Sequence, residues 1–199
     1  EIKECKSNVF DYFVRIPVKG RRGGVWLPIK GYAKIPSDCR ICEGKIKKVN
    51  NHFILLLTIQ KDVEIKTSYS SILAIDLGER VIATAVLSSN QKPIFYGKEI
   101  RGIRRHYSWL RRKLGEKKLL KKIKQIGNKE KKVVNYYLHK ISKQLVSLAH
   151  QHNSLILLGD LKGIRKSAKG KRMNRIVCNM PYYKLTKYIE YKANWLGIK

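Results

Sequence analysis

The stretch ILAIDLG, residues 72 to 78, decides the fold class of this chain. Its apolar run leads directly into Asp76, and a second β-like run follows from Val81 to Leu87. A continuous apolar run bounded by turn residues is typical of a strand buried on both faces. A carboxylate at the end of such a strand is costly unless it is paired, hydrogen-bonded or bound to a metal. Asp76 is therefore a candidate metal ligand, the alternative being an ordinary Asp that initiates a turn.

A second acid follows a similar run later in the chain. Residues 154 to 161, SLILLGDL, are expected to form another fully buried strand that ends at Asp160. Two such strands, separated by a helical hairpin, would bring Asp76 and Asp160 together at one sheet edge. Carboxylates that close need a divalent cation between them, and oxygen ligands favour Mg²⁺ or Mn²⁺. An Asp76 side chain in bulk solvent and distant from Asp160 would contradict this interpretation.

Charge is the second dominant feature. The 199 residues include 44 Lys and Arg but only 14 Asp and Glu, a net charge of +30. With 43% hydrophobic residues the chain can still build a core, so the charge indicates a globular body with a phosphate-binding surface. Nucleic acid is the expected partner. Membrane-surface binding is the competitor, but it needs one amphipathic basic helix or a lipidation site, whereas these cations recur along several segments.

The basic residues concentrate in two regions that are expected to contact nucleic acid. Between residues 98 and 143 there are 17 Lys or Arg and three acids, along helices whose apolar stripes run from Ile103 to Leu114 and across residues 130 to 151. Residues 162 to 175 hold seven cations and no acid, and are expected to be a mobile loop. The candidate nucleic-acid-binding residues are Arg21, Arg22, Arg104, Arg105, Arg111, Arg112, Lys117, Lys118, Lys121, Lys162, Arg165, Lys166, Lys169, Lys171, Arg172 and Arg175.

Two domains are expected, with a boundary in the polar segment from Lys61 to Ser71. Residues 1–68 show four or five short strands with turns about every ten residues, typical of a small, partial β-barrel. Residues 69–199 read as three strands, two helices, a strand and a last helix at 182 to 196. Aromatic residues interleave with the cations, but stacking on bases does not follow from sequence alone.

Four cysteines without secretory context suggest a reducing cytosol, and we expect a cytoplasmic protein. The spacing Cys39-x-x-Cys42 is compatible with half a zinc site, but a structural zinc needs four ligands, and the alternative is a pair of small apolar loop residues. No stretch reaches the 18 to 20 apolar residues that span a bilayer. The chain starts at Glu1 without Met and stops in a helix-end segment, so both ends are expected to be cut.

Three segments together resemble the TnpB family of transposon-encoded, OrfB-type proteins related to type V CRISPR effectors. They are ILAIDLG at 72 to 78, HKISKQLVSLAHQHNSLILLGDLKGIR at 139 to 165, and the stretch from residue 172 to the end. The resemblance implies a wedge-like β-module followed by a RuvC-like domain of RNase H fold. It also implies a transposition-associated, RNA-guided DNA endonuclease with guide RNA and DNA as partners and two divalent metals as cofactors.

Carried over residue by residue, Asp76 matches the first RuvC carboxylate, a catalytic metal ligand. The second is normally the Glu of a strand-end Glu-Asp-Leu, but this chain has Gly159-Asp160-Leu161. Successive strand residues face opposite sides, so Asp160 replaces that Glu only if the strand end twists. The third carboxylate and the zinc ribbon would lie beyond Lys199. The remaining late acid, Glu190, is expected in mid-helix, where the family has no ligand.

The chemistry implied by the resemblance is metal-assisted phosphodiester hydrolysis, with basic segments holding nucleic-acid backbones while base pairing reads sequence. With one acid in place out of three, this chain is expected not to cleave DNA. Two alternatives remain open. One is a noncatalytic remnant of a mobile element that binds RNA or DNA without cutting. The other is an unrelated basic RNA-binding protein with a structural role, for which a carboxylate pair at strand tips has no use.

Overall fold

The computed structural model describes residues 1–31, 34–161, 163 and 170–199. The chain forms two compact units, Glu1–Asp62 and Val63–Lys199. The division between them falls inside the polar segment from Lys61 to Ser71. No helix in the described part of the chain is long and apolar enough to cross a membrane.

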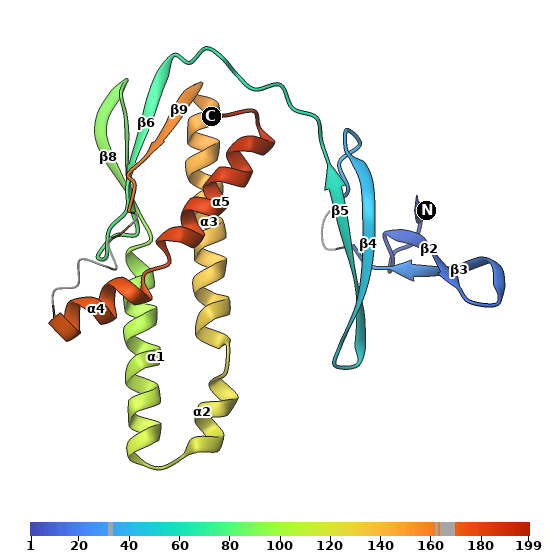
Figure 1. The fold of residues 1–199 in the computed structure, drawn as a ribbon, viewed down its shortest axis with the longest axis horizontal. Coiled ribbons are helices and arrows are strands. Elements are labelled where there is room, and N and C mark those ends of the chain that lie inside the picture. Colours follow the sequence, from blue (N-terminus) through green and yellow to red (C-terminus); the bar gives the residue numbers. More distant parts are fainter. Residues whose placement is uncertain (32–33, 162, 164–169) are drawn as a thin grey trace. The chain divides into compact units, whose positions relative to one another are not determined.

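The first unit is built only from strands, in two separate hydrogen-bonded sheets among its described residues (Figure 1). β1 (Ile2–Glu4), β2 (Tyr12–Val18) and β3 (Arg21–Ile29) form an antiparallel sheet in that order. β4 (Arg40–Val49) and β5 (His52–Gln60) form an antiparallel hairpin. Its turn uses Asn50 at φ 53°, a left-handed conformation that Asn tolerates. A closed or partial barrel stays a prediction, because these two sheets are not joined strand to strand.

The second unit is organised around a four-stranded sheet. β6 (Ser71–Asp76), β7 (Ala83–Leu87) and β8 (Asn90–Tyr96) are antiparallel neighbours, as three successive strands with short connections require. β9 (Ser154–Leu158) joins the other side of β6 in parallel, giving the order β8-β7-β6-β9. The sheet therefore places the ends of β6 and β9 side by side.

Helices fill the long connection between β8 and β9 that a parallel pairing needs. α1 (Lys98–Glu116), α2 (Leu120–Ile126) and α3 (Lys129–Gln151) form a hairpin in which α1 and α3 run side by side (Figure 1). The bounds of α1 and α3 confirm the helical periods, and residues 127 and 128 separate α2 from α3. α5 (Tyr182–Trp195) packs on α3 and confirms the last predicted helix.

The basic segment at 162 to 175 differs from its prediction. We expected a mobile loop through Arg175, but α4 (Gly170–Asn179) makes its last six residues helical. The loop prediction is wrong there because the segment after Gly170 lacks further Gly or Pro and has helix-compatible Lys, Arg and Met. The remaining residues of that prediction, 162 and 164–169, lie outside the described residues.

The core lies on one face of the sheet. Leu73 and Ile75 of β6 are buried against Leu138 and Leu145 of α3 and the helix α5. The opposite face is open in the described structure, because Ile72 is 44% exposed and Leu157 is 58% exposed. The predictions that residues 72 to 75 and 154 to 161 are strands buried on both faces are therefore wrong. An uninterrupted apolar run does not reveal which of its alternating side chains has a covering helix.

Candidate functional site

The register between β6 and β9 places Asp76 beside Gly159. Ile75 pairs with Leu158, and the Gly159 N–H donates to the Ile75 carbonyl at 3.3 Å. Continuing this parallel register by one residue brings Asp76 opposite Gly159, on the face that neighbouring residues in parallel strands share. Asp160 follows one residue later, after β9 has ended at Leu158. The strand ends that carry the two predicted acids are therefore adjacent.

The Asp76 side chain is exposed, which corrects the expectation of a buried acid. The physical reason is the one-sided core, because Asp76 shares the open face of β6 with Ile72 and Ala74. The Asp76 carboxylate nevertheless has an identifiable neighbour, the Tyr182 hydroxyl. Burial raises the pKa of the Tyr182 hydroxyl, and the carboxylates of Glu79 and Asp76 raise that pKa further. The start of α5 therefore lies within electrostatic reach of the β6 end.

These residues do not fit a two-metal site. Within the described residues no three His, Cys, Asp or Glu side chains come together as a possible metal centre. The position facing the same side as Asp76 is Gly159, which offers no ligand atom. A Cβ built there would meet nothing within 4 Å, so a larger side chain has room. Glu190 lies within α5, the mid-helix position that was expected. Its carboxylate lies 2.7 Å from Lys187 Nζ.

The cysteine spacing also gathers no metal ligands in the described part of the chain. Cys42 is exposed on β4, and Cys39 precedes that strand with its Sγ 3.7 Å from Asp38 Oδ1. Burial and the Asp38 charge raise the pKa of the Cys39 thiol, which disfavours the thiolate that zinc binds. The half-site stays a prediction without support from the geometry.

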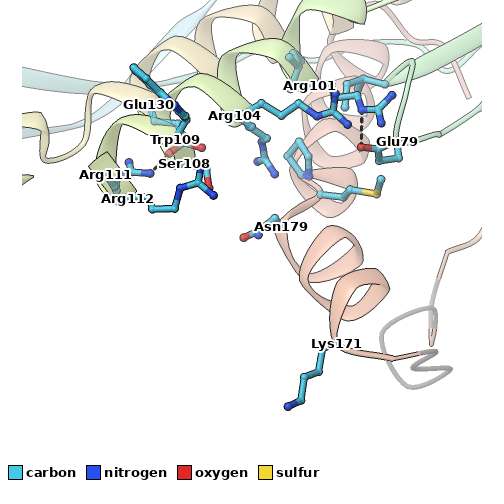
Figure 2. Close-up of a pocket in the computed structure, with 15 residues that line it drawn as sticks. Glu79, Arg101, Arg104, Ser108, Trp109, Arg111, Arg112, Glu130, Lys171 and Asn179 are labelled. Carbon is cyan, nitrogen blue, oxygen red and sulfur yellow. Dashed lines mark hydrogen bonds and ion pairs between the residues drawn. The ribbon is translucent and has the colours of Figure 1, made fainter. Parts of the chain in front are cut away.

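A basic cavity lies beside this strand end, along one face of α1. It has a volume of about 980 Å³, and Figure 2 shows the side chains that line it. The residues of α1 that line it are Ile100, Arg101, Arg104, Arg105, Ser108, Trp109, Arg111 and Arg112. The other lining residues are Glu79, Ile82, Glu130, Lys171, Asn179, Met180 and Pro181. The arginines recur at spacings of three, one, six and one, which places them on one helix face. Four predicted nucleic-acid-binding residues of α1 thus share one cavity.

Two carboxylates hold two of these arginines. Arg101 Nε lies 2.9 Å from Glu79 Oε1, and Arg111 Nη1 donates to Glu130 Oε2 at 2.6 Å. Arg101 is not among the predicted nucleic-acid-binding residues, although its spacing of three from Arg104 places it on the same helix face.

Arg104 lies between these two ion pairs and points into the cavity (Figure 2). Its Nε is buried and has no hydrogen-bond partner among the described residues. Burial lowers the pKa of the Arg104 guanidinium, and the Glu130 charge only partly opposes that change. A guanidinium nevertheless stays charged at all physiological pH values, so α1 holds a partly desolvated cation.

The other predicted cations are distributed over separate surfaces. Arg21 and Arg22 are exposed at the start of β3, and Lys117, Lys118 and Lys121 are exposed where α1 turns into α2. Lys162, Arg165, Lys166 and Lys169 lie outside the described residues, and Arg172 and Arg175 fall in α4 at positions whose side chains are not described. Aromatic groups accompany them, since Trp109 is 50% exposed on α1 and Tyr136 is 65% exposed on α3.

The chain is similar in sequence to two curated proteins. The chain is 31% identical over 156 residues to a TnpB-like protein of Methanocaldococcus jannaschii, a match covering 72% of this chain and 56% of that protein. It is 30% identical over 160 residues to the CRISPR-associated endodeoxyribonuclease Cas12f2 of a Micrarchaeota archaeon, covering 74% of this chain and 29% of the relative. The chain thus spans about half or less of these curated relatives. No protein-family model matches it.

Two solved structures share its fold. A Cas12f1 complex with guide RNA and target DNA superposes with a TM-score of 0.53 at 15% identity, covering 77% of this chain and 40% of that one. A Cas12f ternary complex gives a TM-score of 0.54 at 15% identity, covering 78% and 33%.

The sheet, the helical hairpin and the arginine-lined cavity define a basic protein of the mixed α/β class. Within that class the chain belongs to the TnpB family, as its sequence motifs indicated.

Proposed function

We propose that this chain is the nucleic-acid-binding portion of a transposon-associated, RNA-guided DNA endonuclease of the TnpB type. In this proposal Val63–Lys199 is a RuvC-like domain of RNase H fold, and the preceding strands are a wedge-like module. The sheet order β8-β7-β6-β9, with β9 parallel to β6, supports that fold. A guide RNA and a DNA target are the proposed partners, since the matched relatives include proteins solved with guide RNA and DNA.

The observation that carries the proposal is the basic face of α1. Arginines at helical spacing line a cavity, and two carboxylates fix two of them, Arg101 and Arg111, in place. Arginine forks match phosphate geometry, and fixed arginines lose less entropy when they bind. The exposed lysines at the turn between α1 and α2 extend positive charge along the hairpin. Such a surface favours a phosphate backbone independently of its sequence.

We further propose that the chain binds without cleaving. In the family's chemistry, acids at neighbouring strand ends hold the divalent metals, Mg²⁺ or Mn²⁺, that activate water and stabilise the leaving oxygen. Here Asp76 has the strand-end position, while the position beside it is Gly159. Asp160 can act as a metal ligand together with Asp76 only if the chain after Leu158 turns the Asp160 carboxylate toward the face that carries Asp76.

Binding and cleavage can be tested on the same protein. Fluorescence anisotropy with labelled RNA and DNA should show binding that weakens steeply with salt, with a log–log slope near −0.7 per contacted phosphate on single strands. Incubation of supercoiled plasmid with the chain and Mg²⁺ or Mn²⁺ should leave it intact. If the chain binds neither RNA nor DNA, the proposed function is contradicted. A magnesium-dependent nick that Asp76→Ala abolishes contradicts the noncleaving assignment.

One alternative is distinguished by the same samples. A basic RNA-binding protein with a purely structural role would bind structured RNA but would have no site for single-stranded DNA. Equal salt-dependent affinity for RNA and for single-stranded DNA favours the TnpB-type proposal. Binding confined to folded RNA favours the structural role.

A further inference from the structure

Arg104 is the unusual group of the α1 cavity. Arg101 and Arg104 both have a buried Nε without a hydrogen-bond partner. Arg101 and Arg111 are neutralised by Glu79 and Glu130, whereas Arg104 has no ion pair with an acid among the described residues. A half-buried cation with an unsatisfied Nε costs folding free energy. Such a cost is understandable if an external anion supplies the missing acceptor. The cavity therefore has the character of an anion site.

The walls of the cavity are suited to more than a lone anion. Trp109 lies five residues after Arg104, about 7.5 Å further along the helix axis, and half of its side chain is exposed. Met180 and Pro181, from the connection between α4 and α5, also line the cavity. A volume of about 980 Å³ is near the upper end for small-ligand sites. The cavity thus offers a cation, an indole face and apolar walls.

We propose that this cavity binds one unpaired nucleotide of a single-stranded RNA or DNA, with its phosphate on Arg104 and its base stacked on Trp109. The inference rests on the proposed function and adds to it a defined subsite. A base within a duplex has both faces covered by its neighbours, so an indole can stack only on an unpaired, splayed-out base. Arg105 and Arg112 flank Trp109 on the same helix face and continue the backbone contacts on either side.

The first test measures the phosphate contact. The full 199-residue chain is titrated against labelled single strands of about 12 nucleotides, one RNA and one DNA, and against a duplex of equal length. Arg104→Gln should weaken single-strand binding about tenfold or more, because it removes a charge-assisted hydrogen bond. The control Lys132→Gln removes one exposed charge from α3, outside the cavity, and should cost less than about threefold. Equal losses in the two variants contradict the inference.

The second test measures the stacked base. Binding of a single strand should quench tryptophan emission, and Trp109→Phe should abolish most of that quenching although Trp26 and Trp195 remain. Trp109→Ala should weaken binding of a normal strand at least about fivefold but leave binding of an abasic strand nearly unchanged. Tyr136→Ala, which removes another exposed aromatic, on α3 and outside the cavity, is the control and should spare both strands. Quenching that survives in Trp109→Phe contradicts the inference.

A third measurement separates a binding role from a structural one. Arg104→Met keeps the apolar stem of the side chain and removes the unsatisfied cation, so its thermal midpoint should equal or exceed that of the parent chain. A lower midpoint would show that Arg104 supports the fold, which overturns the inference. Failure of the parent chain to bind any strand would instead reject the proposed function itself. Binding by the parent chain with Arg104→Gln no worse than Lys132→Gln rejects the subsite alone.

Discussion

Gly159 is the residue that separates this chain from a complete pair of strand-end acids. It lies beside Asp76 in the parallel register, its Cβ position is open, and its φ is not in the left-handed region. Nothing in its surroundings therefore requires glycine. The missing carboxylate is a property of this one position and not of the surrounding backbone.

Gly159→Glu should create a divalent-cation site from two same-facing carboxylates. We expect the variant to fold and to bind Mn²⁺ or Mg²⁺ measurably by isothermal titration, because oxygen ligands of opposite charge suit these ions. The double variant Asp76→Ala, Gly159→Glu should lose that binding, and Gly159→Gln should show little. Equal cation binding by the double variant would show that Asp76 and residue 159 do not act together.

His139 gives a residue-scale prediction on pH. Its ring stacks on Tyr188 at a centroid distance of 4.0 Å, and burial, with Lys192 and Lys184, lowers its pKa below the usual 6.5. The unfolded chain then binds more protons than the folded chain, so stability falls as pH drops below about 6.5. His139→Gln should flatten this part of the pH dependence of the thermal midpoint. An unchanged pH profile would show that the shift is not linked to folding.

At the scale of elements, α1 has two functions on two faces. Ile100 is buried in the core and Ile103 packs against it, while the arginine face lines the cavity. The residue at which α1 begins affects both faces, because a helix that began one residue earlier or later would turn the arginines away from the cavity. Gly97 fixes that start with φ 77°, and its Cβ position lies 2.8 Å from Ile141 Cδ1 and 3.0 Å from Ile82 Cβ.

Two Gly→Ala substitutions around α1 should therefore act in opposite directions. Gly97→Ala should destabilise the chain by more than about 1 kcal/mol, since it adds strain and a core contact. Gly102→Ala lies within the helix with nothing within 4 Å and should stabilise by about 0.5–1 kcal/mol. Denaturant unfolding of both variants measures the difference. Equal effects of the two substitutions would contradict the role assigned to Gly97.

The α3 helix carries the core packing that supports the sheet. Leu145→Ala removes a side chain with no exposed surface and should cost about 2–5 kcal/mol of unfolding free energy. Leu120→Ala in α2, where the side chain is 70% exposed, is the matched control and should change stability by less than about 0.5 kcal/mol. Comparable losses at the two positions would place the core elsewhere.

At the scale of the whole molecule, a net charge of +30 should oppose the folded state. Raising the ionic strength from about 0.01 M to about 0.15 M shortens the screening length from about 30 Å to about 8 Å, so the thermal midpoint should rise. A single-stranded nucleic acid should raise it further at equal ionic strength, because binding to the folded state adds to its stability. A midpoint that falls with salt would show that the surface ion pairs outweigh the self-repulsion.

Much of the fold could be predicted from the sequence, for identifiable reasons. The periods of Ile103 to Leu114 and of residues 130 to 151 report helices directly, because a repeat near 3.6 places apolar side chains on one face. The three successive strands followed from short polar turns. The exposure of the open sheet face and the helix at residues 170 to 175 could not be predicted. The first depends on which face the helices cover, and the second on a basic composition that suits loops and helices alike.

The sequence by itself determined the chemistry available to this protein: an excess of cations, strands that end at Asp76 and near Asp160, and the motifs of the TnpB family. Only the tertiary structure decided how these groups combine. The register of two strands whose paired residues are 83 positions apart in the chain sets Gly159 beside Asp76. The packing of α1 near the start of α5 leaves Arg104 unsatisfied in a cavity. Both outcomes depend on contacts between distant segments, which local sequence patterns do not encode.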